Sequence, residues 1–383
     1  MNFEWSEQQL AFQKNLAEFA RIDLADDDVI GRDQRSEFSE SLWQRCADFG
    51  IQGMYVPRHF GGHETADIQT AMLGMETLGY GCRDGGLLLA LNAQMWAVQL
   101  PILHFGTQFQ QELFLPKLCD GRWKGAHGIT EPETGSDVFN MKTTATRYDG
   151  GYVLNGAKCM VTLAPIADLA LVVATVDPSR GKWGISTFLV EKGFKGFSAS
   201  ENHLKMGLRT VPIGELHFED CFVPESYRLG AEGGGFATFN YSLEFERCCI
   251  LASQIGAMQR QLETSIAYAR TRKQFGQPIG KFQSVSNRIA DMKMRLETAR
   301  LMLYKVAWTK SQGKSAMMDA AILKLYLSEC FLESSMDAVR IHGGRGYLTE
   351  TGVERDFRDA FGGVLYAGTS DIQRNIICGL LGL

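Results

Sequence analysis

The stretch FNYSLEFERCCI, residues 239–250, places an acid and a base, Glu246 and Arg247, inside an otherwise apolar segment. It continues into LASQIGAMQRQLE without a proline, and its apolar residues recur mostly at three- and four-residue spacing, which is typical of one buried helix face. These residues are Leu243, Ile250, Leu251, Ile255 and Met258. The sequence therefore predicts a helix in which Glu246 lies beside the buried face.

A carboxylate in such a place has two interpretations. Beside an apolar face Glu246 loses hydration, and a poorly hydrated carboxylate is a usable general base near neutral pH. Alternatively, Glu246 forms a structural ion pair or cap with Arg247 or with a neighbouring helix. The segment alone does not separate these two interpretations.

The composition is that of an ordinary globular protein. The chain has 383 residues, 45% hydrophobic and 22% charged, which is enough for two or three domains with buried cores. The formal net charge of -5 argues against non-specific binding of nucleic acid, which needs a basic surface. No uninterrupted apolar run reaches the roughly 20 residues of a membrane span.

The N-terminus and the cysteines favour a cytoplasmic protein. The first residues, MNFEWSEQQLAFQKN, are acidic and amphipathic, whereas a signal or transit peptide is basic. The nine cysteines contain no CxxC pair, so we expect neither a zinc or other metal site nor a disulfide framework.

Hydrophobic periodicity divides the chain into three parts. Helical spacing occurs over residues 7–19, 40–49, 67–79, 86–105 and 108–118. Alternating patterns follow to about residue 224, with hairpin signals at Asp149-Gly150 and Asn155-Gly156 and strands that include 197–211. The helical period then returns, with one break at FGQPIG, residues 275–280. We therefore predict a mostly α fold with a central β domain: a helical domain (1–120), a β domain (121–230) and a helical bundle (231–383).

Seven short motifs occur in order along the chain. They are ITEPETGSDV (129–138), LNGAKCMVT (154–162), KMGLRT (205–210), LEFER (243–247), ARTRKQFGQPIGKFQ (269–283), IHGGRGY (341–347) and YAGTSDIQR (366–374). Each is weak alone, but in this order and spacing they resemble the acyl-CoA dehydrogenase family of flavoproteins over essentially the whole chain. The fold that this resemblance implies has an N-terminal helical domain, a middle β-barrel-like domain and a C-terminal four-helix bundle.

The resemblance implies an FAD cofactor between the β domain and the C-terminal helices. Ile129, Thr130, Gly135 and Ser136 match the loop that holds the flavin and its pyrophosphate. Thr162 matches a threonine that hydrogen-bonds near the flavin N5. Without the neighbouring motifs, the loop would be interpreted as a simple turn and Thr162 as an ordinary strand residue.

A second group matches positions that reach the diphosphate and adenine of FAD across a subunit interface. Arg272 supplies a planar charged fork suited to phosphate, although alone it would be interpreted as a solvated helix charge. Phe275 and Gln283 follow in the same motif. The resemblance therefore implies a homodimer or homotetramer.

The last two motifs complete the implied cofactor site. Gly343 and Gly344 match glycines that let the backbone approach the cofactor closely, and Arg340 precedes them. Thr369 and Asp371 fall where the family contacts the diphosphate and ribose. Asp371 stands where Gln or Glu is more usual, and its carboxylate suits a sugar hydroxyl.

The chain departs from the family at the catalytic position. Many members carry their catalytic glutamate in Tyr-Glu-Gly-Thr, but here the motif is YAGT and Ala367 cannot take a proton. Branched-chain and long-chain members place the base on an earlier helix just before an arginine, which is where Glu246 and Arg247 stand. The resemblance therefore favours Glu246 as the base, with Arg247 orienting it or contacting the substrate.

Two further points concern residues beside the flavin. The family uses the backbone N–H at the position of Ala367, with a ribityl hydroxyl, to bind the thioester carbonyl, and this needs no side chain. Met160 stands where many members have an aromatic residue, and a methionine can fill that space.

The implied chemistry is FAD-dependent α,β-dehydrogenation of an acyl thioester. Glu246 removes the α proton while hydride passes to flavin N5, with electron transfer flavoprotein or oxygen as the final acceptor. Segments such as GYGCRDGGLLLALNAQMWAVQLPI and KLYLSE look closest to the branch that acts in secondary metabolism on acyl groups bound to carrier proteins. An acyl or peptidyl carrier protein is then the expected partner. Candidates for a basic rim around the pocket mouth are Arg83, Lys205, Arg209 and Arg345.

Three alternatives stay open. The first is an acyl-CoA dehydrogenase of branched-chain or fatty-acid catabolism, and the second is a flavin oxidase or monooxygenase on the same fold. The third is a flavin-binding protein without catalytic activity.

Overall fold

The computed structural model describes residues 4–25, 28–64 and 67–383, and it begins with a layer of helices. These are α1 (Glu7–Ile22), α2 (Val29–Arg35), α3 (Glu40–Phe49), α4 (Ile68–Gly81), α5 (Gly85–Gln94), α6 (Leu100–Phe105) and α7 (Gln108–Cys119). The sequence predicted all of them except α2, which is short. Reciprocal capping boxes start two of them, Ser6 with Gln9 at α1 and Thr107 with Gln110 at α7, because each side chain satisfies a free backbone N–H of the first turn.

A π-helical segment, Met95–Gln99, joins α5 to α6. The joined stretch, Gly85–Phe105, is the one helix in the described part of the chain that is long and apolar enough to cross a membrane. Since 89% of its most apolar window is buried inside the protein, it is a core helix. Short π-helical segments are frequent at functional sites, and the carbonyl of Trp96 in this one accepts a hydrogen bond from Ser242.

The middle of the chain forms one eight-stranded sheet. Its strands are β1 (Gly125–Gly128), β2 (Thr144–Tyr148), β3 (Gly151–Thr162), β4 (Leu169–Thr175), β5 (Ile185–Glu191), β6 (Phe197–Ala199), β7 (Ile213–Pro224) and β8 (Arg228–Leu229). Their order is β6-β7-β3-β2-β4-β5-β8, and β1 pairs in parallel with β4 off this path. The predicted turn between β2 and β3 falls at Asp149-Gly150, where Gly150 takes a φ of 71°.

Two strand-level predictions are wrong. Asn155-Gly156 is not a turn but an irregularity inside β3, where the register with β7 shifts. A Cβ on Gly156 would lie 2.7 Å from the Cα of Thr143, so the glycine is needed for a close backbone approach. Only Phe197–Ala199 of the predicted strand 197–211 pairs in the sheet. The rest passes against α12, since a Cβ on Gly207 would lie 2.2 Å from the carbonyl oxygen of Arg358.

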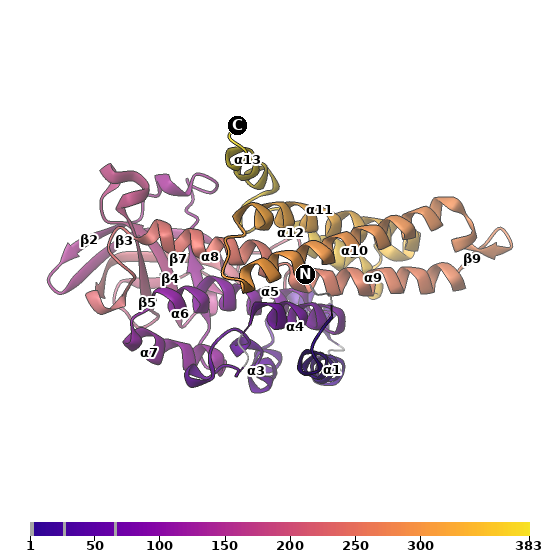
Figure 1. The fold of residues 1–383 in the computed structure, drawn as a ribbon, viewed down its shortest axis with the longest axis horizontal. Helices are drawn as coiled ribbons and strands as arrows, with labels where there is room; N and C mark the ends of the chain where they lie inside the picture. The colour runs from indigo at the N-terminus through magenta and orange to yellow at the C-terminus, as the bar shows by residue number, and fades with distance from the viewer. Residues whose placement is uncertain (1–3, 26–27, 65–66) are drawn as a thin grey trace.

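The C-terminal part is again helical. It contains α8 (Gly235–Cys249), α9 (Ala252–Thr271), α10 (Gln283–Ser311), α11 (Met317–His342), α12 (Val353–Gly363) and α13 (Ser370–Leu380). A hairpin of β9 (Lys273–Gln274) and β10 (Gln277–Pro278) separates α9 from α10. Figure 1 shows this hairpin at the end of the molecule opposite the sheet, with α13 standing off the bundle.

The predicted single break in this helical region is wrong, because the chain also breaks between α8 and α9 and before each of α11, α12 and α13. At the first of these, Ile250 and Leu251 form a turn in place of the continuous helix that the periodicity predicts. The turn lets α9 change direction onto α4, where Gly79 and Gly256 permit backbone contact: a Cβ on Gly256 would lie 2.0 Å from the Glu76 carbonyl oxygen. Periodicity alone does not report such a crossing.

Buried side chains connect the layers. One core joins the N-terminal helices to α8–α11, and a second fills the sheet. A third lies between β4, β5 and the pair α6 and α7. The helix α8 therefore lies where the helices meet the sheet (Figure 1). The prediction of a mostly α fold with a central β domain is confirmed.

Candidate active site

Glu246 lies in the second half of α8 with its side chain almost fully buried. The Oγ of Ser242, one turn earlier, lies 2.9 Å from Oε1 of Glu246. The same hydroxyl lies 3.1 Å from the carbonyl oxygen of Trp96, so its single hydrogen is shared between a carboxylate and the π-helical segment. The carboxylate is thus oriented by its own helix and kept away from bulk water.

His127 approaches the same oxygen from β1. Its Nδ1 lies 3.6 Å from Oε1 of Glu246, and both side chains are only 9% exposed. No hydrogen bond or ion pair engages Oε2 among the residues described. Sequence reasoning did not single out Ser242 or His127, although the spacing of Ser242 to Glu246 was visible in the helix.

Arg247 is buried beside Glu246 but does not pair with it. Across residues 4–25, 28–64 and 67–383 no ion pair joins the two, and the Nε of Arg247 has no hydrogen-bond partner. Burial lowers the pKa of the Arg247 guanidinium, while the charges of Glu246 and Glu244 raise it. No contact among the described residues supports the alternative of a structural ion pair between Glu246 and Arg247.

Glu244 shows what a structural carboxylate on this helix looks like. It is as buried as Glu246, yet its Oε1 lies 3.0 Å from Nζ of Lys310 and accepts the backbone N–H of Ala316 at 2.6 Å. Its charge is therefore compensated within the fold. The partners of Glu246, a serine hydroxyl and an imidazole, leave one carboxylate oxygen available.

Ala367 lies in the loop between α12 and α13 with a left-handed φ of 53°, which is uncommon for a residue with a side chain. Gln373 holds this loop, since its Nε2 donates to the carbonyl oxygens of Ala367 and Gly368 at 3.2 and 3.0 Å. The N–H of Ala367 meets no acceptor in the described chain. A fixed backbone donor without a partner suits an incoming carbonyl oxygen.

A pocket lies next to the residues that follow Glu246 and precede Ala367. Ile250, one turn after Glu246, and Tyr366, next to Ala367, line it together with Gln254, and its space including the open mouth is about 480 Å³. Leucine side chains of α5 form another wall. Charged residues also line it, namely Arg83, Arg260, Asp356 and Asp359. The pocket thus combines an apolar wall for a small acyl group with polar groups that can orient it.

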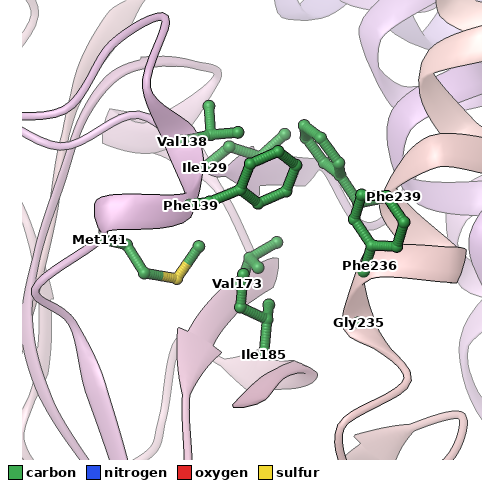
Figure 2. Close-up of a pocket in the computed structure, with 9 residues that line it drawn as sticks. All are labelled: Ile129, Val138, Phe139, Met141, Val173, Ile185, Gly235, Phe236 and Phe239. Atoms are coloured by element: carbon green, nitrogen blue, oxygen red, sulfur yellow. The ribbon is translucent and has the colours of Figure 1, made fainter. Parts of the chain in front are cut away.

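A second, wholly apolar pocket of about 200 Å³ lies at the start of α8 (Figure 2). Figure 2 shows Phe139 facing Phe236 and Phe239 across it, with strand residues of the sheet forming the floor. Its lining comprises Ile129, Val138, Phe139, Met141, Val173, Ile185, Gly235, Phe236 and Phe239. Phe239 and Glu246 are seven residues apart on one helix face. The pocket and the carboxylate therefore lie along the same face of α8, about 10 Å apart along the helix axis.

The predicted flavin loop is held by a buried ion pair that the sequence did not reveal. Glu131 lies 2.7 Å from Nζ of Lys158 and accepts the backbone N–H of Thr143 at 2.9 Å. The same lysine donates to the carbonyl oxygen of Ile129, and the carbonyl oxygen of Thr130 accepts the N–H of Cys159. Ile129 and Thr130 are thereby fixed against β3.

The other predicted flavin contacts lie nearby and are accessible. Gly135 and Ser136 are exposed, and no described atom lies within 4 Å of a Cβ built on Gly135. Met160 is 71% exposed with a φ of 54°, at the irregularity where β3 shifts its register with β7. Thr162 follows at the end of β3.

The predicted diphosphate and adenine contacts lie far from this loop. Arg272 and Gln283 flank the β9–β10 hairpin and are exposed, and Phe275 at its tip is 94% exposed with a φ of 49°. Figure 1 places this hairpin at the opposite end from the sheet, so a single chain does not bring the two groups together.

The remaining predicted residues divide between the two ends. Gly343, Gly344 and Arg340 lie at the end of α11, where Gly343 has a φ of 57° and both glycines are exposed. Thr369 caps α13 by accepting the N–H of Ile372, and the exposed Asp371 pairs with Arg374 at 2.9 Å. Arg340, Gly343 and Gly344 thus lie toward the hairpin and Thr369 lies in the Ala367 loop.

These observations fit a bound FAD. An exposed apolar side chain at Met160, open space at Gly135 and a free N–H at Ala367 are the features that a flat ring with a polar tail requires. Within the described ranges no group of three or more metal-ligating side chains occurs.

Comparison with known proteins gives the family. Models of the acyl-CoA dehydrogenase N-terminal, middle and C-terminal domains match residues 6–122, 126–221 and 233–379. The chain is 42% identical over 378 residues to an L-prolyl-peptidyl-carrier-protein dehydrogenase of Pseudomonas fluorescens, covering 98% of both chains. Among solved structures, the prolyl acyl carrier protein oxidase AnaB has a TM-score of 0.97 and 47% identity, covering 99% of this chain and 100% of that one. PigA with FAD and proline has a TM-score of 0.97 and 40% identity, covering 100% of both. The chain belongs to the acyl-CoA dehydrogenase family.

Proposed function

We propose that this protein is an FAD-dependent dehydrogenase of an acyl thioester carried by a peptidyl or acyl carrier protein in secondary metabolism, with a prolyl group as the first substrate to test. The names of the relatives at 40–47% identity support the carrier and the prolyl group. The single observation that carries the chemistry is the buried carboxylate of Glu246, whose Oε1 has partners and whose Oε2 has none among the residues described.

In this proposal two groups of the chain act on the thioester. The Ala367 N–H donates to the carbonyl oxygen and so acidifies the α C–H, and one such donor contributes about 2.7–4 kcal/mol to transition-state stabilisation. Glu246 accepts the α proton through Oε2. Burial strengthens both effects because water is excluded.

Bound FAD supplies the acceptor for the two electrons and the β hydrogen. Ile129, Thr130, Gly135, Ser136 and Thr162 would hold its flavin half. Since Arg272, Phe275 and Gln283 lie at the far end of the same chain, they would serve the FAD of a partner subunit in a homodimer or homotetramer.

The carrier arm would enter along α8. Phe239 of the apolar pocket lies on the same helix face as Glu246, so an arm that passed through this pocket would be directed toward the carboxylate. At the rim, Nζ of Lys182 lies 4.8 Å from the ring centre of Phe236 and 5.2 Å from that of Trp183, which is 56% exposed. Arg180 in the same loop is exposed. This basic and aromatic loop suits an acidic carrier protein.

The basic rim proposed here therefore differs in part from the one that the sequence suggested. Lys205 cannot belong to a rim, because its Nζ is buried without a partner in the described chain and burial lowers its pKa to about 8. Arg345 lies directly after Gly343 and Gly344 at the end of α11. Arg83 is exposed, but it lines the pocket beside Gln254.

The cellular setting remains a proposal. All nine cysteines are free, which fits a reducing cytoplasm. Electron transfer flavoprotein or oxygen would reoxidise the flavin.

Anaerobic mixing of the yellow holoenzyme with thioesters tests the function. We expect a prolyl carrier thioester to bleach the flavin, and fatty acyl-CoA and branched acyl-CoA thioesters to do so more slowly or not at all. A monooxygenase would instead need a reductant and oxygen, and a protein without activity would keep its colour with every thioester.

The glutamates of α8 provide a matched pair of variants. Glu246→Gln should retain FAD, but substrate should bleach its flavin about a thousandfold more slowly, since the proton acceptor is gone. Glu244→Gln, two residues earlier and equally buried, should still bleach at nearly the normal rate. Equal bleaching by wild type and Glu246→Gln would refute the assignment of the base.

A further inference from the structure

The carboxylate of Glu246 is constrained at one oxygen only. Ser242 contacts Oε1 from within α8, and His127 approaches Oε1 from the sheet. In the base that the proposed function requires, Oε1 is therefore held by neighbouring residues, whereas Oε2 has no partner among the residues described. The proposed function gives His127 no role.

The sequence around His127 directs its ring toward α8. In β1, Gly125 and His127 share one strand face, and a Cβ on Gly125 would lie 2.9 Å from Val98 of the π-helical segment. Ala126 and Gly128 share the other face, where Ala126 belongs to the core of the sheet. Strand alternation therefore points His127 away from the sheet core and toward the helices.

The surroundings leave Glu246 as the natural partner of this ring. The segments on the helical side of β1, α5 and Met95–Gln99, carry no charged side chain, and neither does the paired strand β4. On the opposite face, Lys158 is engaged by Glu131 at 2.7 Å. Arg247 follows Glu246 on α8, and its Nε is buried without a partner among described residues.

We propose that His127 is a positioning residue that donates Nδ1–H to Oε1 of Glu246 in the substrate complex, leaving Oε2 as the atom that takes the α proton. The separation of 3.6 Å is longer than a hydrogen bond by about 0.6 Å, and catalytic hydrogen bonds that are long without substrate tighten when it binds. With Ser242 and His127 on either side of Oε1, the carboxylate plane is fixed by two elements from distant parts of the chain.

The inference rests on the proposed function and concerns rate, not binding. A misplacement of the base by about 1 Å lowers the rate of proton removal by about a hundredfold. No hydrogen bond or ion pair among the described residues joins the His127 side chain to the flavin loop, and His127 does not line the apolar pocket at Phe236, so we expect substrate binding and FAD content to change little without it.

Two substitutions separate the N–H donor from the shape of the ring. His127→Leu removes the donor, whereas His127→Asn keeps an N–H near the position of Nδ1. We expect His127→Leu to slow both flavin bleaching and the exchange of the substrate α hydrogen with deuterated water by about 10- to 100-fold at saturating substrate, with KM changed by less than about threefold. The rates of bleaching and of exchange for His127→Asn should lie within about fivefold of the wild-type rates. His203→Asn, the same change at a half-exposed histidine, is the matched control.

The outcomes are distinct. A His127→Leu enzyme with wild-type exchange and bleaching overturns the inference, and so does a His127→Asn enzyme as slow as His127→Leu, because the donor is then not what matters. If His127→Leu does not fold, the Asn variant alone decides: an Asn rate more than about tenfold below wild type overturns it. If no thioester bleaches the flavin of the wild-type enzyme, the proposed function itself fails, and the inference fails with it.

Discussion

Gln254 donates a hydrogen bond of 2.9 Å from Nε2 to the hydroxyl of Tyr366, which joins α9 to the loop that carries Ala367. In the described chain the Oε1 of Gln254 is buried without a partner, so this bond is the anchor of the amide. The same pair lines the pocket that Ile250, one turn after Glu246, also lines. Pocket shape and the placement of the Ala367 N–H are thus coupled.

Tyr366→Phe should therefore weaken both the fold and the reaction. It leaves the buried Gln254 amide unpaired, which costs about 1–3 kcal/mol, and it loosens the loop that carries Ala367. We expect a lower melting temperature and a kcat that falls more than KM rises. Tyr347→Phe, at a tyrosine that is 84% exposed, is the control. An unchanged melting temperature for Tyr366→Phe would show that the bond does not anchor the loop.

Lys324→Met should stabilise the protein at neutral pH. The Nζ of Lys324 is buried without a partner in the described residues, and burial lowers its pKa to about 8 from 10.5. The folded protein thus binds this proton more weakly than the unfolded chain, so a penalty of about 3 kcal/mol is present below about pH 8 and disappears as pH rises toward 10.5.

The measurement is thermal unfolding of wild type and Lys324→Met at neutral pH and near pH 10. The stabilisation by Lys324→Met should be largest at neutral pH and should shrink at the higher pH. Lys305→Met, at a half-exposed lysine paired with Asp319, should change little at either pH. A destabilised Lys324→Met protein at neutral pH would contradict the argument.

Asp359 should make the protein lose stability as pH rises through the mildly acidic range. Burial raises the pKa of this carboxyl from 3.8 to about 7. The hydrogen bond that the carboxyl accepts from the N–H of Leu208 acts in the opposite direction and lowers the pKa. The folded protein holds the proton more tightly than the unfolded chain, so stability falls by up to about 4 kcal/mol between about pH 4 and pH 7 and is level above.

Asp359→Asn keeps an acceptor for Leu208 and removes the titration. Its melting temperature should fall less than that of wild type as pH rises from about 4 to 7, and it should exceed wild type at neutral pH. Asp356→Asn on the same helix, beside Arg260, should not flatten the profile. Parallel profiles for wild type and Asp359→Asn would count against a buried titrating group.

Lys182→Glu should impair the carrier-linked substrate selectively. Reversing this charge at the rim of the apolar pocket repels an acidic carrier, so KM for the carrier thioester should rise by about tenfold and its salt dependence should weaken. The kcat with a pantetheine thioester that lacks the protein should stay the same. Equal effects on both substrates would mean that Lys182 acts on the pocket and not on the carrier.

Sequence patterns were sufficient for the fold class and for placing Glu246 on a buried helix. Periodicity reports which residues face a core, and Glu246 lies beside the apolar positions of α8 as that pattern predicts. Periodicity also gave the order of the three parts, and the family motifs agreed with it.

The partners of Glu246 could not be predicted in the same way. His127 reaches it from a strand far away in the chain, and Ser242, its other partner, contacts the equally distant carbonyl oxygen of Trp96. A lone histidine in the stretch GAHG, residues 125–128, carries no periodic signal. The break at Ile250 was also hidden, because the apolar spacing continues through it and only the close crossing of α4 and α9 reveals the change of direction.

The run of α8 from Phe239 to Glu246 has a further consequence, since a helix rises by a constant 1.5 Å or so per residue and does not stretch. If the carrier arm runs along α8 as proposed, this fixed rise sets the length that the tether must span before its thioester comes level with the carboxylate. Progressive shortening of the tether should then erode turnover in steps, even though the atoms that react stay the same.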